Sequence, residues 1–500
     1  MHKAKRNIIT TLISQLVTTA CGIVIPGMLI SAFGSAMYGL AASVVQFLSY
    51  ISLLEGGVAR VARAELYAPL ARKENYEISR VYHAIKHFFV MVGIAFLGYT
   101  LLMSVAYHDI AQITEVDWGY TFCLIWIISA GTLAKYMGGL SNLTLLNADQ
   151  KQYIGNYIVT AGTIANALLV VVLVKSGCDL LVVKFGSSIV YIAQPICYAL
   201  YVRKHYNLPS VGKDRSELQQ KWTGIGQHIA YFLHTNTDVV ILTLFADLRY
   251  VAVYSIYRLV ISSIRKIAAS FSSGMEAAFG EVIAKKEQQS LQNIYFKYKH
   301  MLSFTSIVLF GVTAVLIVPF VRLYTAGVTD ANYTQPVFAI VLLLAEAIDC
   351  FIHPCCSLPI SANKLKETRW GSYGEAAINI VLSLILVHWN PLVGIALATL
   401  IATVFKSVFY MIYSGKNILH VRFRILLKNY LLAIGLISLF AVLGMILMAN
   451  IPINSYYVWV IWGIGIFVVV SGFAAAVYFL FYPTELKVVL MSTLHKLKHQ

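Results

Sequence analysis

The sequence contains little charge. Only 12% of its 500 residues are Asp, Glu, Lys or Arg, and 59% are hydrophobic, whereas about a quarter of the residues of soluble domains are charged. This shortage excludes an ordinary soluble globular protein. The composition is typical of a polytopic membrane protein.

Motifs for catalysis and cofactor binding are also missing. The chain has no phosphate-binding glycine loop, no nucleophilic triad and no nucleotide motif, since the glycines of GIGQHIAYF (224–232) begin an apolar helix instead of following a strand. The seven cysteines are scattered, and Cys178 is the only one in a predicted outward loop, so neither a disulfide framework nor a metal-ligand spacing is present. We predict no cofactor and no metal site.

Long apolar runs fill most of the chain. Each is about 20 residues long, which is enough to cross roughly 30 Å of hydrocarbon as a helix. None alternates polar and apolar residues like a strand of a membrane barrel. We predict an all-α fold with about fourteen transmembrane helices, near residues 7–31, 37–64, 84–106, 118–140, 152–174, 179–202, 225–246, 250–280, 301–325, 334–358, 370–389, 391–414, 429–450 and 456–482.

Lys and Arg are concentrated in alternate loops. Because positive residues are retained on the cytoplasmic side, the pattern places both termini there and leaves only Lys175, Arg249 and Arg322 outside. The net charge of +16 then reflects topology, and we expect no nucleic-acid partner. The predicted outward loops have about ten residues or fewer. Such short loops favour a transporter over an enzyme that joins sugars at the outer surface.

The two halves of the chain resemble each other. Residues 28–48 align with 240–260, and residues 166–186 align with 379–399 at nearly the same offset, which pairs Asn166 with Asn379. A parallel repeat of six helices predicts two lobes with a substrate path between them. We expect lobes at 1–203 and 225–414, a cytoplasmic linker at 204–224, and two extra helices with a tail at 415–500.

Three motifs carry a family resemblance: FGSAMYGLAASVVQFLSYISLLEGGVAR (33–60), TDVVILTLFADLRYVAVYSIYRLV (237–260) and INIVLSLILVHWNPLVGIALAT (378–399). They resemble bacterial polysaccharide flippases of the multidrug/oligosaccharidyl-lipid/polysaccharide exporter superfamily. The Leu-Ala-Thr at 397–399 departs from the small-residue pattern of that family.

The resemblance implies a cargo and a location. Members move undecaprenyl-pyrophosphate-linked oligosaccharides, or lipid-linked wall precursors, from the inner to the outer leaflet of the bacterial cytoplasmic membrane. The partners that it implies are the lipid-linked oligosaccharide, membrane lipids and a polysaccharide polymerase machinery.

Ionisable residues inside spanning helices are functional candidates by default. Asp238 and Arg258 lie nine residues before and eleven residues after Asp247, so both should sit about 13 to 16 Å below the tip of one hairpin. They form either a structural ion pair or part of a binding site, in which Asp238 would serve coupling or gating. Tyr254, Arg258, Ser262 and Arg265 recur on one face. A basic, water-filled wall suits pyrophosphate, because guanidinium groups grip phosphate oxygens in pairs, so we predict that Arg258, Arg265 and Tyr254 bind substrate.

A second basic group lies near the cytoplasmic end of the predicted helix 37–64. Arg60 and Arg63 share a helix face, Glu55 precedes them, and Gly56-Gly57 can loosen the helix. We predict that the arginines meet the pyrophosphate first, at the inward mouth of the path, and that Glu55 holds them in position. The alternative is that both arginines are anchors that snorkel to the membrane surface.

A stripe on the predicted helix 334–358 contains Glu346, Asp349 and His353 at helical spacing. Two carboxylates and a histidine on one face predict coupling to a proton or a cation. The alternative is ordinary hydrogen-bonded core packing.

These observations predict a flippase that works by alternating access, with lobe 1–203 rocking against lobe 225–414. A multidrug antiporter of the same superfamily is the first alternative, although its cavity should be dominated by acidic residues. A membrane glycosyltransferase or polymerase is the second, and the short outward loops disfavour it.

Overall fold

The computed structural model describes residues 2–56, 58–209, 225–270, 275–449 and 453–482, apart from the side chains of residues 2–5, 60, 225, 227–228 and 447–449. Every regular element in these ranges is helical. Ten helical segments among them are long and apolar enough to cross a membrane. The protein is therefore an all-α, multi-pass membrane protein, as predicted.

The chain forms two compact units. One consists of Met1–Phe232 with Leu242–Ala252, and the other of Leu233–Ile241 with Val253–Gln500. The helices of the first half are α1 (His2–Ser49), α2 (Val58–Arg72), α3 (Asn75–Ile110), α4 (Trp118–Ala134), α5 (Leu140–Ala148), α6 (Gln152–Lys175) and α7 (Leu180–His205). The 3-10 turn η1 (Tyr50–Glu55) precedes α2, and the π-helical turn η2 (Lys135–Gly139) joins α4 to α5.

The second half begins with the hairpin that both units share. Its helices are α8 (Ile225–Phe245), α9 (Leu248–Ser270), α10 (Met275–Ala284), α11 (Gln288–Tyr324), α12 (Pro336–Ser361), α13 (Leu365–Leu386), α14 (Pro391–Ser414), α15 (Phe423–Ala449) and α16 (Tyr456–Phe481), and the π-helical turn η4 (Gly415–Leu419) follows α14.

Side-chain caps fix where several helices begin. The carboxylates of Asp117 and Asp179 accept hydrogen bonds from Gly119 N and Leu181 N at 3.0 and 2.9 Å, and so start α4 and α7. Asn390 caps α14 in the same way, followed by a proline at the first helical position. These caps place the first turns of helices that line the sites described below.

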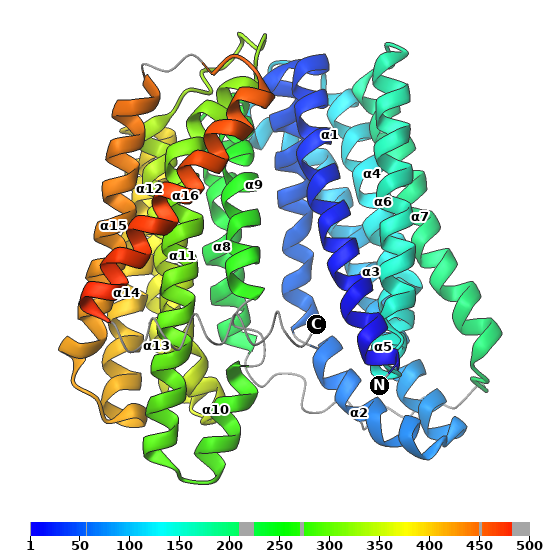
Figure 1. Ribbon diagram of the computed structural model, residues 1–500. Coiled ribbons are helices and arrows are strands. Elements are labelled where there is room, and N and C mark those ends of the chain that lie inside the picture. Colours follow the sequence, from blue (N-terminus) through cyan, green and yellow to red (C-terminus); the bar gives the residue numbers. More distant parts are fainter. Residues whose placement is uncertain (1, 57, 210–224, 271–274, 450–452, 483–500) are drawn as a thin grey trace. The chain divides into compact units, whose positions relative to one another are not determined.

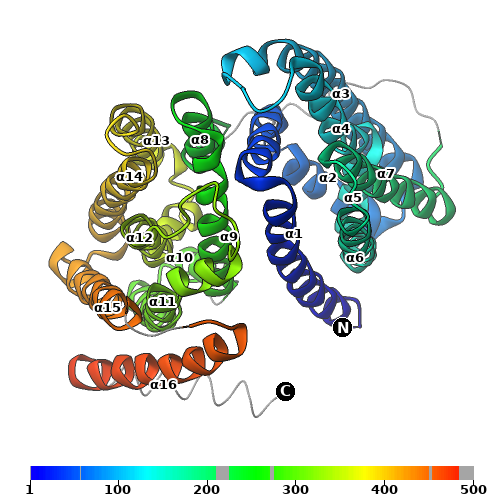
Figure 2. The same cartoon turned by 90° about the horizontal axis from the view of Figure 1, so that it is seen from above.

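In the first unit, α1 packs along α6, and α7 packs against α4 and α6, as Figures 1 and 2 show. Leu40, Phe89, Phe96 and Leu145 are fully buried in its core. The short α2 runs across the ends of these upright helices (Figure 1) and contacts α3 and α5.

The predicted helix 37–64 is wrong as a single element. Predicted spans 7–31 and 37–64 begin as one long α1 that breaks at Gly34 (φ 83°, ψ 168°) and ends at Ser49. The turn η1 follows, and Gly56 adopts φ 53°, a left-handed conformation that glycine tolerates best. The chain changes direction there, so Glu55 lies outside the helix that carries Arg60 and Arg63. The predicted helix 250–280 coincides with α9 and the first part of α10, and residues 271–274 between them lie outside the described residues.

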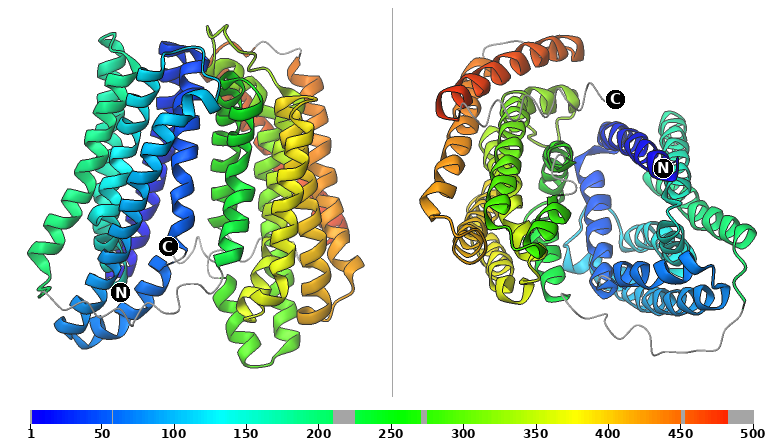
Figure 3. Two further views of the ribbon diagram at one scale, coloured as in Figure 1. Left: turned by 180° about the vertical axis from the view of Figure 1, so that it is seen from behind. Right: turned by 60° about the horizontal axis from the view of Figure 1, so that its bottom comes forward.

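In the second unit, α11 packs against α12, α15 and α16, and α14 packs against α12 and α13. Figure 2 shows α16 as the outermost element beside α11, and Figure 3 shows α12 and α14 from the opposite side. The Trp459 indole of α16 donates to Leu316 O of α11 at 3.2 Å. Glycines permit close contacts, because a Cβ on Gly444 would lie 2.8 Å from Val315 Cα.

Apart from the short α10, three helices of the second half are not among the ten apolar segments. They are α8, which has only a shorter apolar stretch at Ile229–Phe245, and α9 and α13. With these three, and with α1 counted as two passes, the helices correspond to the fourteen predicted spans. The three exceptions carry charged side chains that meet inside the second unit.

Candidate functional site

Arg258 lies in a hydrogen-bonded cluster between α8 and α9. Its Nη1 donates to Tyr254 OH at 2.6 Å, and Tyr254 OH donates to Asp238 Oδ2 at 2.6 Å. Arg258 Nη1 is 3.9 Å from the same carboxylate oxygen, and Nη2 donates to Thr235 O. The structure thus brings Asp238 and Arg258 together, with Tyr254 between them.

The two charges of this cluster differ in exposure. The Arg258 side chain is 31% exposed, whereas that of Asp238 is 2% exposed. Asp238 also lies 3.4 Å from Thr399 Oγ1 of α14, which accepts a hydrogen bond from Asn379 Nδ2 of α13 at 3.0 Å. Four helices therefore hold the carboxylate, and the guanidinium group remains partly open to a ligand.

Arg265 lies two turns further along α9 and has two carboxylate partners. Its Nη1 is 2.8 Å from Glu346 Oε2, and its Nη2 is 2.8 Å from Asp349 Oδ2. Both carboxylates come from α12, where a spacing of three residues puts them on one face. Each contact is a charge-assisted hydrogen bond, which is shorter and stronger than a neutral one.

Lys406 of α14 extends the network. Its Nζ is 2.9 Å from Asp349 Oδ1 and 3.1 Å from Glu375 Oε1 of α13. His234 Nε2 of α8 lies 3.3 Å from the same Glu375 oxygen. The chain of contacts from Arg265 to His234 therefore joins α8, α9, α12, α13 and α14.

The network contains one more carboxylate than it contains cations. The cations are Arg258, Arg265 and Lys406, and the carboxylates are Asp238, Glu346, Asp349 and Glu375. One negative charge is in excess when His234 is neutral, so the set is balanced when it binds one proton. Buried charges are stable only when they are paired, which makes this group of side chains suited to holding and releasing a single positive charge.

The other predicted site residues have different neighbours. His353 lies on α12, but its Nδ1 is 3.5 Å from Ser357 Oγ, one turn away. Glu55 accepts a hydrogen bond from Tyr136 OH at 2.5 Å, and Arg63 Nε donates to Ala59 O of its own helix at 3.3 Å. The backbone of Arg60 is part of α2, and its side chain lies outside the described residues. The described contacts thus do not join Glu55 to Arg63, because the break at Gly56 separates their elements.

Sequence reasoning missed the part played by three residues. Glu375, Lys406 and His234 lie inside predicted spanning helices but are not part of the predicted site. Their convergence depends on which helices are neighbours, which spacing along one helix does not reveal. The signal that was available is that each is an ionisable residue inside a spanning helix.

Comparison with known proteins gives a match at the level of the fold only. No protein-family model and no curated protein sequence matches the chain. Among solved structures, the lipid II flippase MurJ in an inward closed conformation aligns with a TM-score of 0.70 at 14% identity, covering 95% of this chain and 98% of that one.

Multidrug transporters align as well. The MATE transporter DinF-BH in complex with R6G gives a TM-score of 0.57 at 17% identity, over 83% of this chain and 95% of that one. An inward-facing MATE family transporter of the MOP superfamily gives 0.52 at 13% identity, over 82% and 96%. The chain therefore has the fold that MurJ and the MATE transporters of the multidrug/oligosaccharidyl-lipid/polysaccharide exporter superfamily share.

Proposed function

We propose that the protein is a flippase that moves an undecaprenyl-pyrophosphate-linked oligosaccharide across the bacterial cytoplasmic membrane for cell-surface polysaccharide synthesis. In this proposal the pyrophosphate is exposed alternately to the two sides of the membrane while the lipid tail stays in the bilayer. The protein itself catalyses no reaction. Both termini are cytoplasmic, and the flipped product passes to a polysaccharide polymerase machinery.

The main support for this proposal is that Arg258 is partly exposed and only partly neutralised. Its side chain is 31% exposed, and the nearest oxygen of Asp238 is 3.9 Å away from Nη1, so the guanidinium charge is only partly neutralised. A guanidinium group presents its donors in a planar fork that matches two phosphate oxygens. Arg258 is therefore the primary ligand of the pyrophosphate, and Tyr254 holds it in position.

Arg265 has a smaller part in substrate binding than Arg258. Both of its terminal nitrogens already lie 2.8 Å from carboxylates, so its charge is largely satisfied within the protein. Arg60 and Arg63 remain the proposed first contacts of the head group, on α2. Glu55 contributes by fixing the turn before α2 through its hydrogen bond with Tyr136, rather than by holding the arginines.

Coupling to a proton or a cation is the second part of the proposal. Glu346 and Asp349 belong to the network with one excess negative charge, whereas His353 contacts Ser357. We assign the coupling role to the two carboxylates and place His353 at the margin of the coupling group.

A multidrug antiporter is the alternative function. The structural match to DinF-BH in complex with R6G favours it, because the same fold serves the transport of multidrug substrates. A cation-selective cavity should be dominated by acidic side chains. The charged network has one carboxylate more than it has cations, so the argument against a cationic substrate rests on Arg258, whose partly exposed guanidinium group would repel it.

Deletion of the gene tests the proposal directly. We expect lipid-linked sugars to accumulate on the inner leaflet of the deleted strain, measured by mass spectrometry, and to disappear when the full chain is restored. Unchanged lipid-linked sugars together with increased sensitivity to cationic dyes would favour the antiporter. Sugar transfer by the purified protein alone would favour a glycosyltransferase or polymerase.

A further inference from the structure

A cavity of about 710 Å³ lies within the first unit, apart from the charged network of α8 to α14. Side chains from α1, α4, α5, α6 and α7 line it. Its volume is in the range of pockets that hold small-molecule ligands. Its wall is mainly apolar, with Ile25, Leu29, Leu143 and Val159 among the lining residues.

Two lysines give this apolar cavity a positive charge. Lys184 comes from the second turn of α7, and Lys135 comes from the π-helical turn η2. No Asp or Glu is among the lining residues. Within the described residues, neither ammonium group has a carboxylate at ion-pair distance. Lys184 is half-buried, whereas Lys135 is exposed. A half-buried ammonium group beside an apolar wall is costly unless a counter-charge is supplied, so the Lys184 side of the cavity is complementary to an anion.

Asn166 of α6 places an unsatisfied hydrogen-bond acceptor in the wall of the cavity. It is 4% exposed, and its Nδ2 lies 3.3 Å from Tyr191 OH of α7. Its Oδ1 is buried and has no hydrogen-bond partner. Leaving such an acceptor unsatisfied costs about 1–3 kcal/mol, which a ligand that brings an O–H or N–H donor would recover.

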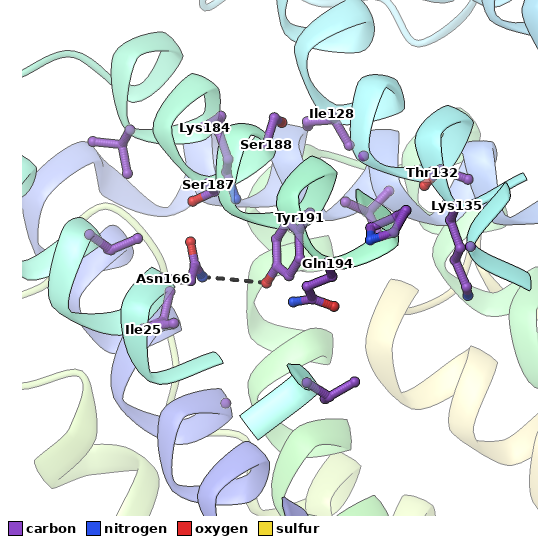
Figure 4. Close-up of a pocket in the computed structure, with 18 of the residues that line it drawn as sticks. Ile25, Ile128, Thr132, Lys135, Asn166, Lys184, Ser187, Ser188, Tyr191 and Gln194 are labelled. Carbon is purple, nitrogen blue, oxygen red and sulfur yellow. Dashed lines mark hydrogen bonds between the residues drawn. The ribbon is translucent and has the colours of Figure 1, made fainter. Parts of the chain in front are cut away.

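The polar groups are separated along the cavity. Figure 4 shows Lys184, Ser187 and Asn166 gathered on one side, Thr132 and Lys135 on the other, and Tyr191 and Gln194 between them. A ligand that fills the cavity needs an anionic group and a donor at the Lys184 side and an apolar body over the remaining wall.

We propose that this cavity binds an anionic phospholipid of the surrounding bilayer that has a hydroxylated head group. The phosphate lies against Lys184, a head-group hydroxyl donates to Asn166 Oδ1, and an acyl chain covers the apolar wall. Free phosphate would leave that wall empty, and a cationic amphipath would be repelled by both lysines. The site is independent of the proposed function, because it concerns a resident lipid in one unit and not the cargo.

The experiment uses native mass spectrometry of the full chain in a neutral detergent. Phosphatidylglycerol and phosphatidylcholine with identical acyl chains are titrated in turn. We expect phosphatidylglycerol to bind at least about tenfold more tightly, because phosphatidylcholine has the same phosphate but no head-group hydroxyl for Asn166 Oδ1 and carries a quaternary ammonium group that Lys184 repels. Lys184→Met should remove most of this preference, and Lys175→Met, an exposed lysine at the end of α6, is the matched control.

Two further variants complete the test. Val159→Trp fills the apolar part and should weaken the binding of both lipids. Lys184→Met should melt no lower than the wild type in lipid-free detergent, because it removes a charge that no carboxylate of the described residues neutralises. Arg258→Lys should leave phosphatidylglycerol binding unchanged, which separates this site from the proposed flippase site.

Equal binding of the two lipids would overturn the proposal. So would an identical loss of preference in Lys184→Met and Lys175→Met, because both results would mean that the lipid is attracted by general surface charge. The complementation test of the proposed flippase function is a separate experiment. A failure to restore flipping there would not change the lipid affinities measured here.

Discussion

At the scale of single residues, Arg258 and Arg265 differ in how far their charges are neutralised. Arg265 has a carboxylate oxygen 2.8 Å from each terminal nitrogen, whereas the nearest carboxylate oxygen of Arg258 is at 3.9 Å. Tyr254 OH lies between Arg258 and Asp238 and bonds to both. The two arginines share a helix face but have different chemical tasks, because only Arg258 keeps a guanidinium edge for a ligand.

Exchange of the two charges at 238 and 258 tests the role of Arg258. In a protein with both Arg258→Asp and Asp238→Arg, we expect insertion and folding to be retained, because the pair is preserved, while transport fails, since a carboxylate at 258 repels the pyrophosphate. Arg258→Lys should also impair transport, because a point charge lacks the planar fork. Complementation of the deleted strain measures transport, and size-exclusion chromatography checks folding.

The matched control for Arg258→Lys is Arg249→Lys at the tip of the same hairpin, where Arg249 pairs with Asp247 and its side chain is 46% exposed. It should complement fully. Full complementation by the charge-exchanged protein as well would reduce Arg258 to a structural partner of Asp238.

Lys406 is predicted to stabilise the second unit through its two carboxylate partners. Lys406→Met leaves Glu375, with a side chain only 3% exposed, without its cation, and removal of one partner of a buried pair costs about 3–5 kcal/mol. The double variant Lys406→Met/Glu375→Gln should recover most of the loss, because Asp349 still pairs with Arg265. Thermal unfolding in detergent measures both effects. A double variant no more stable than Lys406→Met would argue against this pairing, and Lys266→Met, exposed on α9, controls for loss of charge.

At the scale of elements, glycines decide how closely helices approach. A Cβ on Gly39 of α1 would lie 1.9 Å from Leu248 O at the start of α9. We expect Gly39→Ala to destabilise the first unit by about 1–3 kcal/mol, as overpacking does. Gly98→Ala on α3 has nothing within 4 Å of the added Cβ and should be neutral or stabilising by up to about 1 kcal/mol. Thermal unfolding separates the two, and equal effects would mean that the Gly39 contact is not rigid.

Glu346 on α12 is predicted to couple transport to an ion gradient. Glu346→Gln should reduce the dependence of transport on an ion gradient while the protein stays folded, because Asp349 still neutralises Arg265. His353→Ala should have little effect, since His353 contacts Ser357. Transport is measured in vesicles with and without the gradient. If transport by Glu346→Gln still depended on the gradient to the same extent, Glu346, Asp349 and His353 would serve only the packing of the core.

Much of the element order could be predicted from the sequence, because apolar runs of sufficient length leave few alternatives in a membrane. The break at Gly56 could not, since a glycine pair tolerates both a helix and a left-handed turn. Likewise, the proximity of Asp238 and Arg258 could be predicted from helical rise, whereas the convergence of Lys406, Glu375 and His234 depends on the packing of helices that are distant in sequence.

At the scale of the whole molecule, the distribution of positive charge predicts topology. With fourteen spans and basic residues at both ends, the N- and C-termini should both be cytoplasmic. A fluorescent protein fused to either end should fluoresce in the cytoplasm, and alkaline phosphatase fused there should be inactive. Phosphatase fused after Asp330, in the segment between α11 and α12, is the control and should be active. Phosphatase activity at only one terminus would require an odd number of spans.

The charged network in the second unit also has a consequence for the order in which its helices enter the membrane during synthesis. The helices α9 and α13 are too polar to be among the ten apolar segments. The carboxylates that neutralise Arg265 of α9 come from α12, which is translated later. A charged helix that leaves the translocon alone enters lipid at a cost of several kcal/mol. We therefore expect α9 to stay at the insertion machinery until α12 has been translated, so that these helices enter the bilayer as a group and not one by one.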